Sequence, residues 1–242
     1  MSEFAMTEKE WSVGWFGKLP CVGDFIRSGL SPQFISNWDG WMQAMMASGR
    51  EALGEAWQTC YMEAPIWRFA LPQHVCGPHP VSGIVMPSVD RVGRHYPFCL
   101  AMEGPSQIRA ATAWDIYQRH TPLYELLESI ALAMLEDGAS VDGLQAALSA
   151  FPKRHESAPP VATFSVGNAD LIAQMTSVQS QLANLAVRGG ETLWVAAVGP
   201  EHRTILSRGM PDGRDLAATL FNLHDPVWQT DDEDADLQGV EA

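Results

Sequence analysis

Residues 66–102 carry the sequence IWRFALPQHVCGPHPVSGIVMPSVDRVGRHYPFCLAM, and this stretch decides the fold class. It contains three short apolar runs, at residues 66–71, 81–87 and 96–102, which clusters of proline, glycine and polar residues separate. Apolar runs of this length between turn residues predict β-strands at the spacing of hairpins. One more short strand is predicted at residues 13–16, ahead of the turn-rich residues 17–20.

A helix is predicted between the first strand and these three. Ser31 and Pro32 mark its start, because serine caps a helix and proline suits the first helical position. The apolar residues behind them repeat at helical spacing and form one stripe, typical of a core helix: Phe34, Trp38, Trp41, Met42 and Met45. Ser48-Gly49 is expected to break or bend this helix before a second piece around Trp57.

The second half of the chain is predicted to be mostly helical. Thr121-Pro122 predicts the start of a helix that ends near Gly138, and Ser140 predicts the start of a shorter one. The remaining predicted elements are a strand at 161–166, a helix at 168–188, a hairpin of strands 192–198 and 203–207, and a short helix around 216–221. Hairpin-linked strands grouped apart from helices predict an α+β layered fold, in which helices flank a mainly antiparallel sheet.

Composition predicts one folded body between two tails. The chain has 242 residues, of which 46% are hydrophobic and 18% charged, and this is a globular composition. We expect residues 1–12 to be disordered or a cloning remnant, residues 13–228 to form a single domain, and residues 229–242 to be an acidic, disordered tail. A boundary between two domains near residues 107–113 is the alternative.

Net charge and the pattern of cysteines limit the classes of protein to which this chain can belong. The net charge is −14, and −8 remains when the six acidic residues of the tail are left out, so the body repels nucleic acid. No stretch approaches the roughly 20 apolar residues of a membrane span. The four cysteines form no CxxC motif and are predicted to be reduced and mostly buried: Cys21, Cys60, Cys76 and Cys99. We expect a cytoplasmic protein without membrane insertion.

Nucleotide and metal motifs are weak in this sequence. Gly14 and Gly17 precede Lys18, but a phosphate-binding P-loop needs four residues between its glycines and a Ser or Thr after the lysine. Imidazole and thiolate groups that suit zinc occur at His74, Cys76, His79, His95 and Cys99, at a spacing that matches no zinc-finger pattern. We expect no metal and no cofactor.

The charged turn Asp90-Arg91-Val92-Gly93-Arg94 has several interpretations. Arginine binds carboxylate or phosphate through two parallel hydrogen bonds, so the turn is a candidate partner-binding surface, with Lys18, Asp24 and Arg27 at its flank. Alternatively, Asp90 and the arginines lock the strands together, and three glycines permit special backbone angles: Gly17, Gly23 and Gly93. A third interpretation pairs Asp24 with Asp90 as the carboxylates of a hydrolase.

Two stretches carry a resemblance to a known family. Residues 14–25, GWFGKLPCVGDF, are similar to the N-terminal signature of the TagF (ImpM) family, which a helix with tryptophans follows, here Trp38 and Trp41. The second stretch comprises WRFAL from Trp67, CGP at 76–78, and the run GxVMPSVDRVGRxxP that ends at Pro97. The clear match covers about residues 14–101, and the later part agrees more loosely.

The resemblance implies a negative, post-translational regulator of bacterial type VI secretion, which works through the forkhead-associated (FHA) scaffold protein of the apparatus. We therefore expect a non-enzymatic, cytoplasmic interaction protein. Its expected partner-binding residues are Lys18, Asp24, Arg27, Asp90, Arg91 and Arg94. The alternatives are a structural or assembly subunit of the apparatus and a hydrolase that uses Asp24 and Asp90. The sequence leaves the oligomeric state open.

Overall fold

The computed structural model describes residues 11–105, 111–152, 191–199 and 201–228. Within these ranges the strands form one antiparallel sheet of seven, in the order β2-β1-β5-β4-β3-β6-β7. The strands are β1 (Ser12–Gly17), β2 (Ile26–Ser28), β3 (Trp67–Leu71), β4 (Val81–Met86), β5 (Phe98–Glu103), β6 (Glu191–Val198) and β7 (Glu201–Arg208). The predicted α+β fold and its antiparallel sheet are confirmed.

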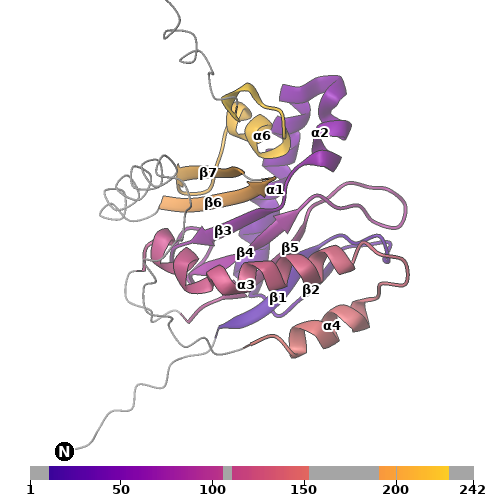
Figure 1. Cartoon of the computed structure of the whole chain (residues 1–242), viewed down its shortest axis with the longest axis vertical. Helices are drawn as coiled ribbons and strands as arrows, with labels where there is room; N and C mark the ends of the chain where they lie inside the picture. Colours follow the sequence, from indigo (N-terminus) through magenta and orange to yellow (C-terminus); the bar gives the residue numbers. More distant parts are fainter. Residues whose placement is uncertain (1–10, 106–110, 153–190, 200, 229–242) are drawn as a thin grey trace, which may run out of the picture.

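Helices cover both faces of the sheet. Figure 1 shows α3 (Ala113–Ala133) in front of the strands and α1 (Pro32–Leu53) behind them. The shorter helices are α2 (Trp57–Glu63), α4 (Val141–Ser149) and α6 (Arg214–Phe221). None of these described helices is long and apolar enough to cross a bilayer. Strands β6 and β7 follow residues 153–190 in the chain and still join the same sheet, through β3.

Helix α1 begins where the sequence predicts. The Ser31 side chain accepts a hydrogen bond from the backbone N–H of Phe34 at 3.2 Å, and Pro32 occupies the first turn. The Ser31 hydroxyl also donates to the buried carboxylate of Glu103 at 2.6 Å, and the Ser31 backbone N–H donates to it at 2.8 Å. This cap therefore fixes the start of α1 to the end of β5.

A row of small residues across the sheet makes room for α1. Gly14, Ala101 and Gly83 lie directly opposite one another on β1, β5 and β4, and Phe69 and Trp194 continue the row on β3 and β6. Residues that pair in this way point to the same face of a sheet. On that face Trp38 of α1 packs at 4.8 Å from Phe69, between ring centroids. The predicted apolar stripe of α1 is confirmed as core.

The opposite face packs against α3 and α4. The next row, Trp15, Leu100 and Ile84, belongs to a second apolar cluster together with Leu123 and Leu127 of α3. Leu144 and Leu148 of α4 complete this cluster, and the Ser140 side chain caps α4 as predicted. Burying each of these large apolar side chains contributes roughly 1.5–3 kcal/mol, so the two clusters hold the layers together.

Two predicted helix boundaries are wrong. Helix α1 does not break at Ser48-Gly49 but continues to Leu53, because Gly49 faces the core. A Cβ at this position would lie 2.5 Å from the Trp57 ring, so Gly49 serves close packing. Helix α3 does not begin at Thr121-Pro122 but at Ala113, where Thr112 and Asp115 form a reciprocal capping box that outweighs the proline signal.

Three further differences concern short or outlying segments. Strand β2 was not predicted, because three residues carry too little pattern. Trp11 and Ser12, which we assigned to the N-terminal segment, are part of the fold: the Trp11 ring lies 4.2 Å from the His120 ring, and Ser12 belongs to β1. The predicted strand at 161–166, the helix at 168–188 and the acidic tail lie outside the described residues.

The glycine row predicts a clear difference between two Gly→Ala variants. A Cβ on Gly83 would lie 2.8 Å from the Cα of Ala101 and 3.0 Å from the Phe69 ring, so Gly83→Ala should lower the free energy of unfolding by about 2 kcal/mol or more. Gly40, in the middle of α1, has open space around it, so Gly40→Ala should raise that free energy by about 0.5–1 kcal/mol. Urea unfolding of both variants checks this, and a neutral Gly83→Ala variant would contradict the packing described.

Candidate functional site

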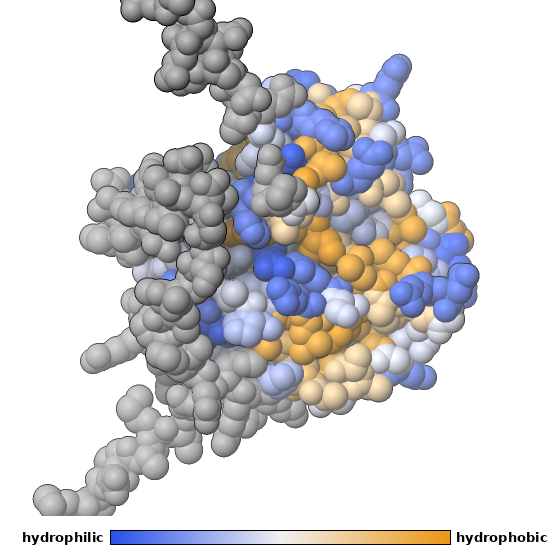
Figure 2. Space-filling model, in the orientation of Figure 1, coloured by the Kyte–Doolittle hydropathy of each residue, from blue (hydrophilic) through white to orange (hydrophobic). Residues whose placement is uncertain are grey.

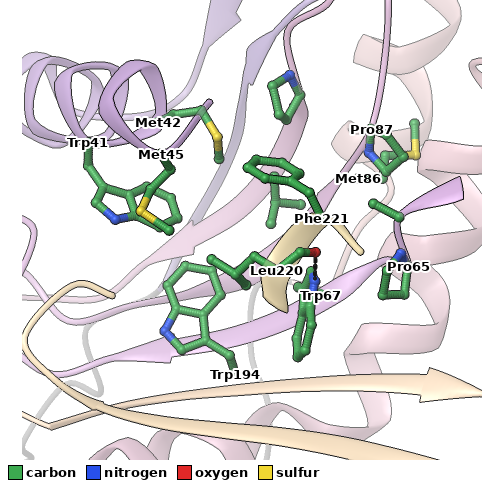
Figure 3. A pocket seen from close by; sticks show the side chains of 13 residues that line it. Trp41, Met42, Met45, Pro65, Trp67, Met86, Pro87, Trp194, Leu220 and Phe221 are labelled. Carbon is green, nitrogen blue, oxygen red and sulfur yellow. Dashed lines mark hydrogen bonds between the residues drawn. The ribbon is translucent and has the colours of Figure 1, made fainter. Parts of the chain in front are cut away.

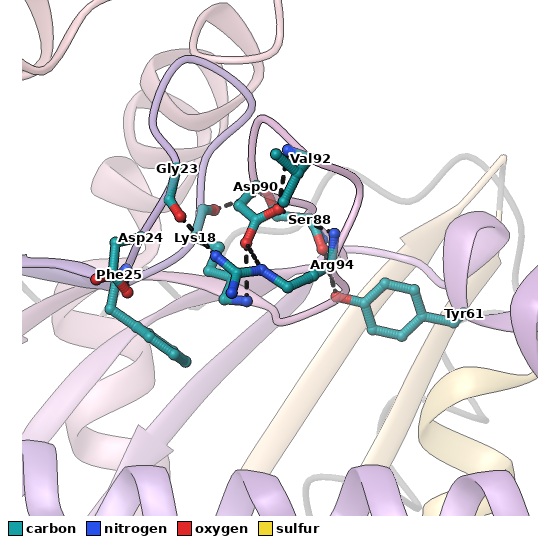
Figure 4. A network of polar contacts seen from close by, with 9 residues as sticks. All are labelled: Lys18, Gly23, Asp24, Phe25, Tyr61, Ser88, Asp90, Val92 and Arg94. Atoms are coloured by element: carbon teal, nitrogen blue, oxygen red, sulfur yellow. Dashed lines mark hydrogen bonds and ion pairs between the residues drawn. The ribbon is translucent and has the colours of Figure 1, made fainter.

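A buried carboxylate organises the end of the sheet where β4 and β5 are connected. Asp90 is only 2% exposed, and Figure 4 shows its neighbours converging on it. One oxygen, Oδ2, accepts hydrogen bonds from Nζ of Lys18 at 3.0 Å and from Nε of Arg94 at 2.6 Å. The other, Oδ1, accepts from the backbone N–H groups of Val92 at 3.1 Å and Arg94 at 2.9 Å. Both oxygens of Asp90 are thus occupied.

The chain around Asp90 forms a tight turn. The backbone N–H of Gly93 donates to the carbonyl of Asp90 at 2.8 Å, and the N–H of Asp90 donates to the carbonyl of Arg94 at 3.1 Å. Gly93 has a φ of +84°, a backbone conformation that glycine adopts without steric cost. The predicted role of Gly93 in a turn is confirmed, and the Asp90 side chain closes the same turn from inside.

A second loop, residues 18–25 between β1 and β2, is fastened to this turn. The backbone N–H of Arg91 donates to the carbonyl of Val22 at 2.8 Å, and Nη2 of Arg94 donates to the carbonyl of Gly23 at 2.6 Å. The Ser88 hydroxyl, at the start of this turn, donates to the carbonyl of Lys18 at 2.8 Å. We call residues 18–25 the lysine loop and residues 88–95 the arginine turn. Together with the Lys18–Asp90 ion pair, these bonds make the two segments one unit.

Tyr61 of α2 supports the arginine turn from the α1 side of the sheet. Its hydroxyl accepts a hydrogen bond from the backbone N–H of Ser88 at 3.0 Å and donates to the carbonyl of Ser88 at 2.7 Å. The Tyr61 side chain is fully buried, and burial raises the pKa of its hydroxyl, so it stays protonated and can donate. The base of the arginine turn is therefore fixed in the core.

The pKa of Asp90 lies well below the ordinary value of an aspartate. Burial by itself would raise this pKa, because it disfavours the charged form. The backbone N–H of Arg94, the side chains of Lys18 and Arg94, and the backbone N–H of Val92 stabilise the carboxylate and together outweigh burial. Asp90 is consequently an anion at neutral pH.

Gly17, Gly23 and Trp67, which the sequence motifs contain, each have a different structural role. Gly17 has a φ of +138°, and its Cα packs against the backbone of Pro97 and Phe98, where a side chain would collide. Gly23 has no positive φ, which corrects our backbone-angle interpretation: a Cβ there would lie 3.2 Å from Nη2 of Arg91. Trp67 is buried and donates from Nε1 to the carbonyl of Leu220 at 2.9 Å, which ties β3 to α6.

The six predicted partner-binding residues lie on the lysine loop, β2 and the arginine turn, and they divide by exposure. Lys18 and Asp90 are buried, so they hold the two segments together and are not accessible to a partner. The other four are exposed: Asp24, Arg27, Arg91 and Arg94. Sequence reasoning missed two exposed apolar neighbours, Phe25 at 42% and Val92 at 69%. The available signal was an apolar residue between charged residues in each segment.

The hydrolase and zinc interpretations receive no support from this geometry. Asp90 has both oxygens engaged, and Asp24 is exposed. Cys76 and Cys99 are buried, and burial raises the pKa of both thiols, that of Cys76 to about 12, which disfavours the thiolate that binds metal. In the described part of the chain, no three His, Cys, Asp or Glu side chains gather closely enough to hold a metal ion.

An apolar pocket lies between α1, α6 and the ends of β3 and β4 (Figure 3). Its volume is about 20 Å³, room for about one water molecule, whereas small-molecule sites measure roughly 300–1,000 Å³. The labelled side chains around it in Figure 3 are those of Trp41, Met42, Met45, Pro65, Trp67, Met86, Pro87, Trp194, Leu220 and Phe221. Such a lining offers no acid, base or nucleophile.

The comparison with protein families decides the identity of the chain. A family model described as the TagF N-terminal domain, type VI secretion system-associated, matches residues 14–151. This range contains the lysine loop, the arginine turn and helices α3 and α4, and it is more than half of the 242 residues. The chain belongs to the TagF family. It is a type VI secretion-associated protein, and the predicted resemblance is confirmed.

The fold of this TagF-family chain also occurs in a solved structure. The crystal structure of PA0076 from Pseudomonas aeruginosa PAO1, at 2.05 Å resolution, superposes with a TM-score of 0.64 and 28% sequence identity. The similarity covers 87% of this chain and 94% of PA0076. A search of curated proteins gives no match. The similarity to PA0076 therefore extends beyond the 14–151 range of the family model.

The geometry of Asp90 predicts a specific response to acid. Because its folded-state pKa lies below the ordinary value of 3.8, the stability that ionised Asp90 contributes is complete above about pH 4 and is lost as the pH falls toward the folded-state pKa. Asp90→Asn should lower the melting temperature at pH 7 by more than about 5 °C. The difference from wild type should shrink below about pH 4.

Thermal unfolding followed by circular dichroism between pH 7 and pH 3 measures this difference. Asp24→Asn makes the same charge change at an exposed position, so it should melt with the wild type throughout. An Asp90→Asn variant that melts with the wild type at pH 7 would show that the carboxylate does not hold the two segments.

Proposed function

We propose that this chain is a non-enzymatic, post-translational negative regulator of bacterial type VI secretion, which acts in the cytoplasm by binding the FHA scaffold component of the apparatus. The observation that carries the proposal is the match of the TagF N-terminal domain model over residues 14–151. The resemblance of the GKLP and MPSVDRVGR segments implies this role for family members. The two segments overlap the lysine loop and the arginine turn, which form one unit.

The side chains of the lysine loop and the arginine turn are better suited to binding a protein than to catalysis. The carboxylate of Asp90 is held as an anion by four hydrogen bonds, so it cannot exchange a proton readily near neutral pH. In contrast, exposed arginines beside exposed apolar side chains are typical of protein–protein interfaces. A regulator that binds a scaffold needs such a surface and needs no substrate pocket.

The proposal is tested by secretion of the tube protein into the medium. We expect cells that lack the chain to secrete more of it, and cells that overproduce the chain to secrete less, while the amount of tube protein inside the cells stays the same. Immunoblots of medium and cell fractions, with a cytoplasmic marker as lysis control, measure both. Plasmid-borne expression at the native level should restore normal secretion to the deletion strain.

The opposite sign would assign a different role. Lost secretion on deletion would mean that the chain is a structural or assembly subunit, and repression would have to be given up. The FHA partner is tested separately, by co-purification of the tagged chain with the FHA scaffold protein from the same cells. We expect the two proteins to elute together in gel filtration, and their separate elution at micromolar concentration would contradict the FHA part of the proposal.

A further inference from the structure

Six exposed residues of the lysine loop, β2 and the arginine turn make up what we call the arginine surface: Asp24, Phe25, Arg27, Arg91, Val92 and Arg94. The Phe25 ring stacks on Phe16 at 5.6 Å between centroids, and Arg27 lies directly opposite Phe16 in the β1–β2 ladder, so Phe25 and Arg27 share a face. On the other flank, Arg94 is bonded to the carbonyl of Gly23, two residues from Phe25 (Figure 4).

The arginine surface is cationic on an acidic protein. It holds three arginines and one aspartate, a net charge of +2, whereas the whole chain carries −14. The buried Lys18–Asp90 pair beneath it adds no net charge. Charges separated by more than about 8–10 Å are largely screened at physiological salt, so a partner that touches this surface meets its local positive charge. The charge that complements it is negative.

Arg91 is available to bind. Its side chain is exposed and lies against Gly23, and within the described residues it makes no hydrogen bond or ion pair. Its backbone N–H, in contrast, is bonded to Val22, so the guanidinium projects from a fixed base. Because the backbone beneath it is already ordered, only the Arg91 side chain has to lose conformational freedom when its guanidinium binds a carboxylate through two hydrogen bonds.

Two apolar side chains stand beside the arginines. Val92 projects from the tip of the arginine turn and is 69% exposed. Phe25 is 42% exposed, although the ring of Tyr96 packs on one side at 4.6 Å and Nζ of Lys18 lies 5.0 Å from its centroid. Arginine and aromatic residues dominate the binding energy of protein interfaces, where an apolar contact is surrounded by polar ones.

We propose that the arginine surface is the docking site for an acidic protein segment that presents an apolar side chain between its carboxylates. The carboxylates bind Arg91 and Arg27, and the apolar side chain packs on Phe25 and Val92. The lysine loop and the arginine turn preorganise the site. This inference rests on the proposed function, in which binding a scaffold protein restrains secretion, and it names the surface and the chemistry of the bound segment.

The test uses a double variant and a control matched to it. Arg91→Glu with Val92→Glu removes one arginine and one apolar side chain from the arginine surface, and neither side chain is needed for the turn. Arg119→Glu with Leu132→Glu makes the same two changes on exposed residues of α3. Figure 2 shows an apolar area over the part of the molecule where α3 and α4 lie. This area is an alternative docking surface, and the control variant tests it as well. Both double variants should melt within about 3 °C of the wild type.

Binding of the purified FHA scaffold protein is measured by isothermal titration calorimetry, and repression by secretion of the tube protein from overproducing cells. We expect the 91/92 variant to bind at least about tenfold more weakly and to lose repression, and the α3 control to behave as wild type. Arg91→Lys, which keeps the charge but loses the planar fork, should weaken binding less than Arg91→Glu.

The outcomes separate the two proposals. Full binding and repression by the 91/92 variant would overturn the arginine surface and leave the proposed function standing. Loss in the α3 control alone would overturn it too and place the partner on α3. A wild-type chain that represses without binding the FHA protein would refute that partner, and the repression assay of the same variants would then decide the surface. A wild-type chain that does neither would overturn both proposals.

Discussion

The ion pair between Lys18 and the buried carboxylate of Asp90 is the constraint on which this end of the molecule depends. Lys18 follows β1 and Asp90 follows β4, and β5 lies between these strands in the sheet. A buried aspartate without partners would be costly, so the lysine loop, the arginine turn and their backbone N–H groups must keep one arrangement. Arg91 and Arg94, which belong to the arginine turn, are held in place by this arrangement.

The sheet beneath supplies the frame for that arrangement. Small residues at Gly14, Gly83 and Ala101 let α1 pack closely on one face, while the large side chains of the neighbouring row meet α3 on the other. Tyr61, from α2, reaches Ser88 only because α1 and the turn after it place α2 beside the strand ends. A three-layer body therefore carries the arginine surface at one end, and such a packed support is what the proposed docking site requires.

The sequence predicted most strands and the start of α1 because alternating turn and apolar segments, and the Ser31-Pro32 cap, are local signals. It failed where local signals compete: the Thr112–Asp115 capping box fixes the start of α3, although Pro122 suggested a later one. It could not choose among the three interpretations of Asp90, because burial of this residue depends on Lys18, 72 positions away. The exposed Phe25 and Val92 were missed, since exposure of an apolar residue is decided by tertiary packing.

The Lys18–Asp90 ion pair makes the lysine loop and the arginine turn one cooperative unit, and Lys18→Met tests this most directly. Methionine nearly preserves the volume of the lysine side chain but removes its charge, and it leaves every bond within the arginine turn chemically intact. Hydrogen–deuterium exchange of the two segments, followed by mass spectrometry, is the measurement. We predict that amides of residues 90–94 exchange at least about tenfold faster in the variant, together with those of residues 18–25. Faster exchange confined to residues 18–25 would show that the two segments do not form one unit.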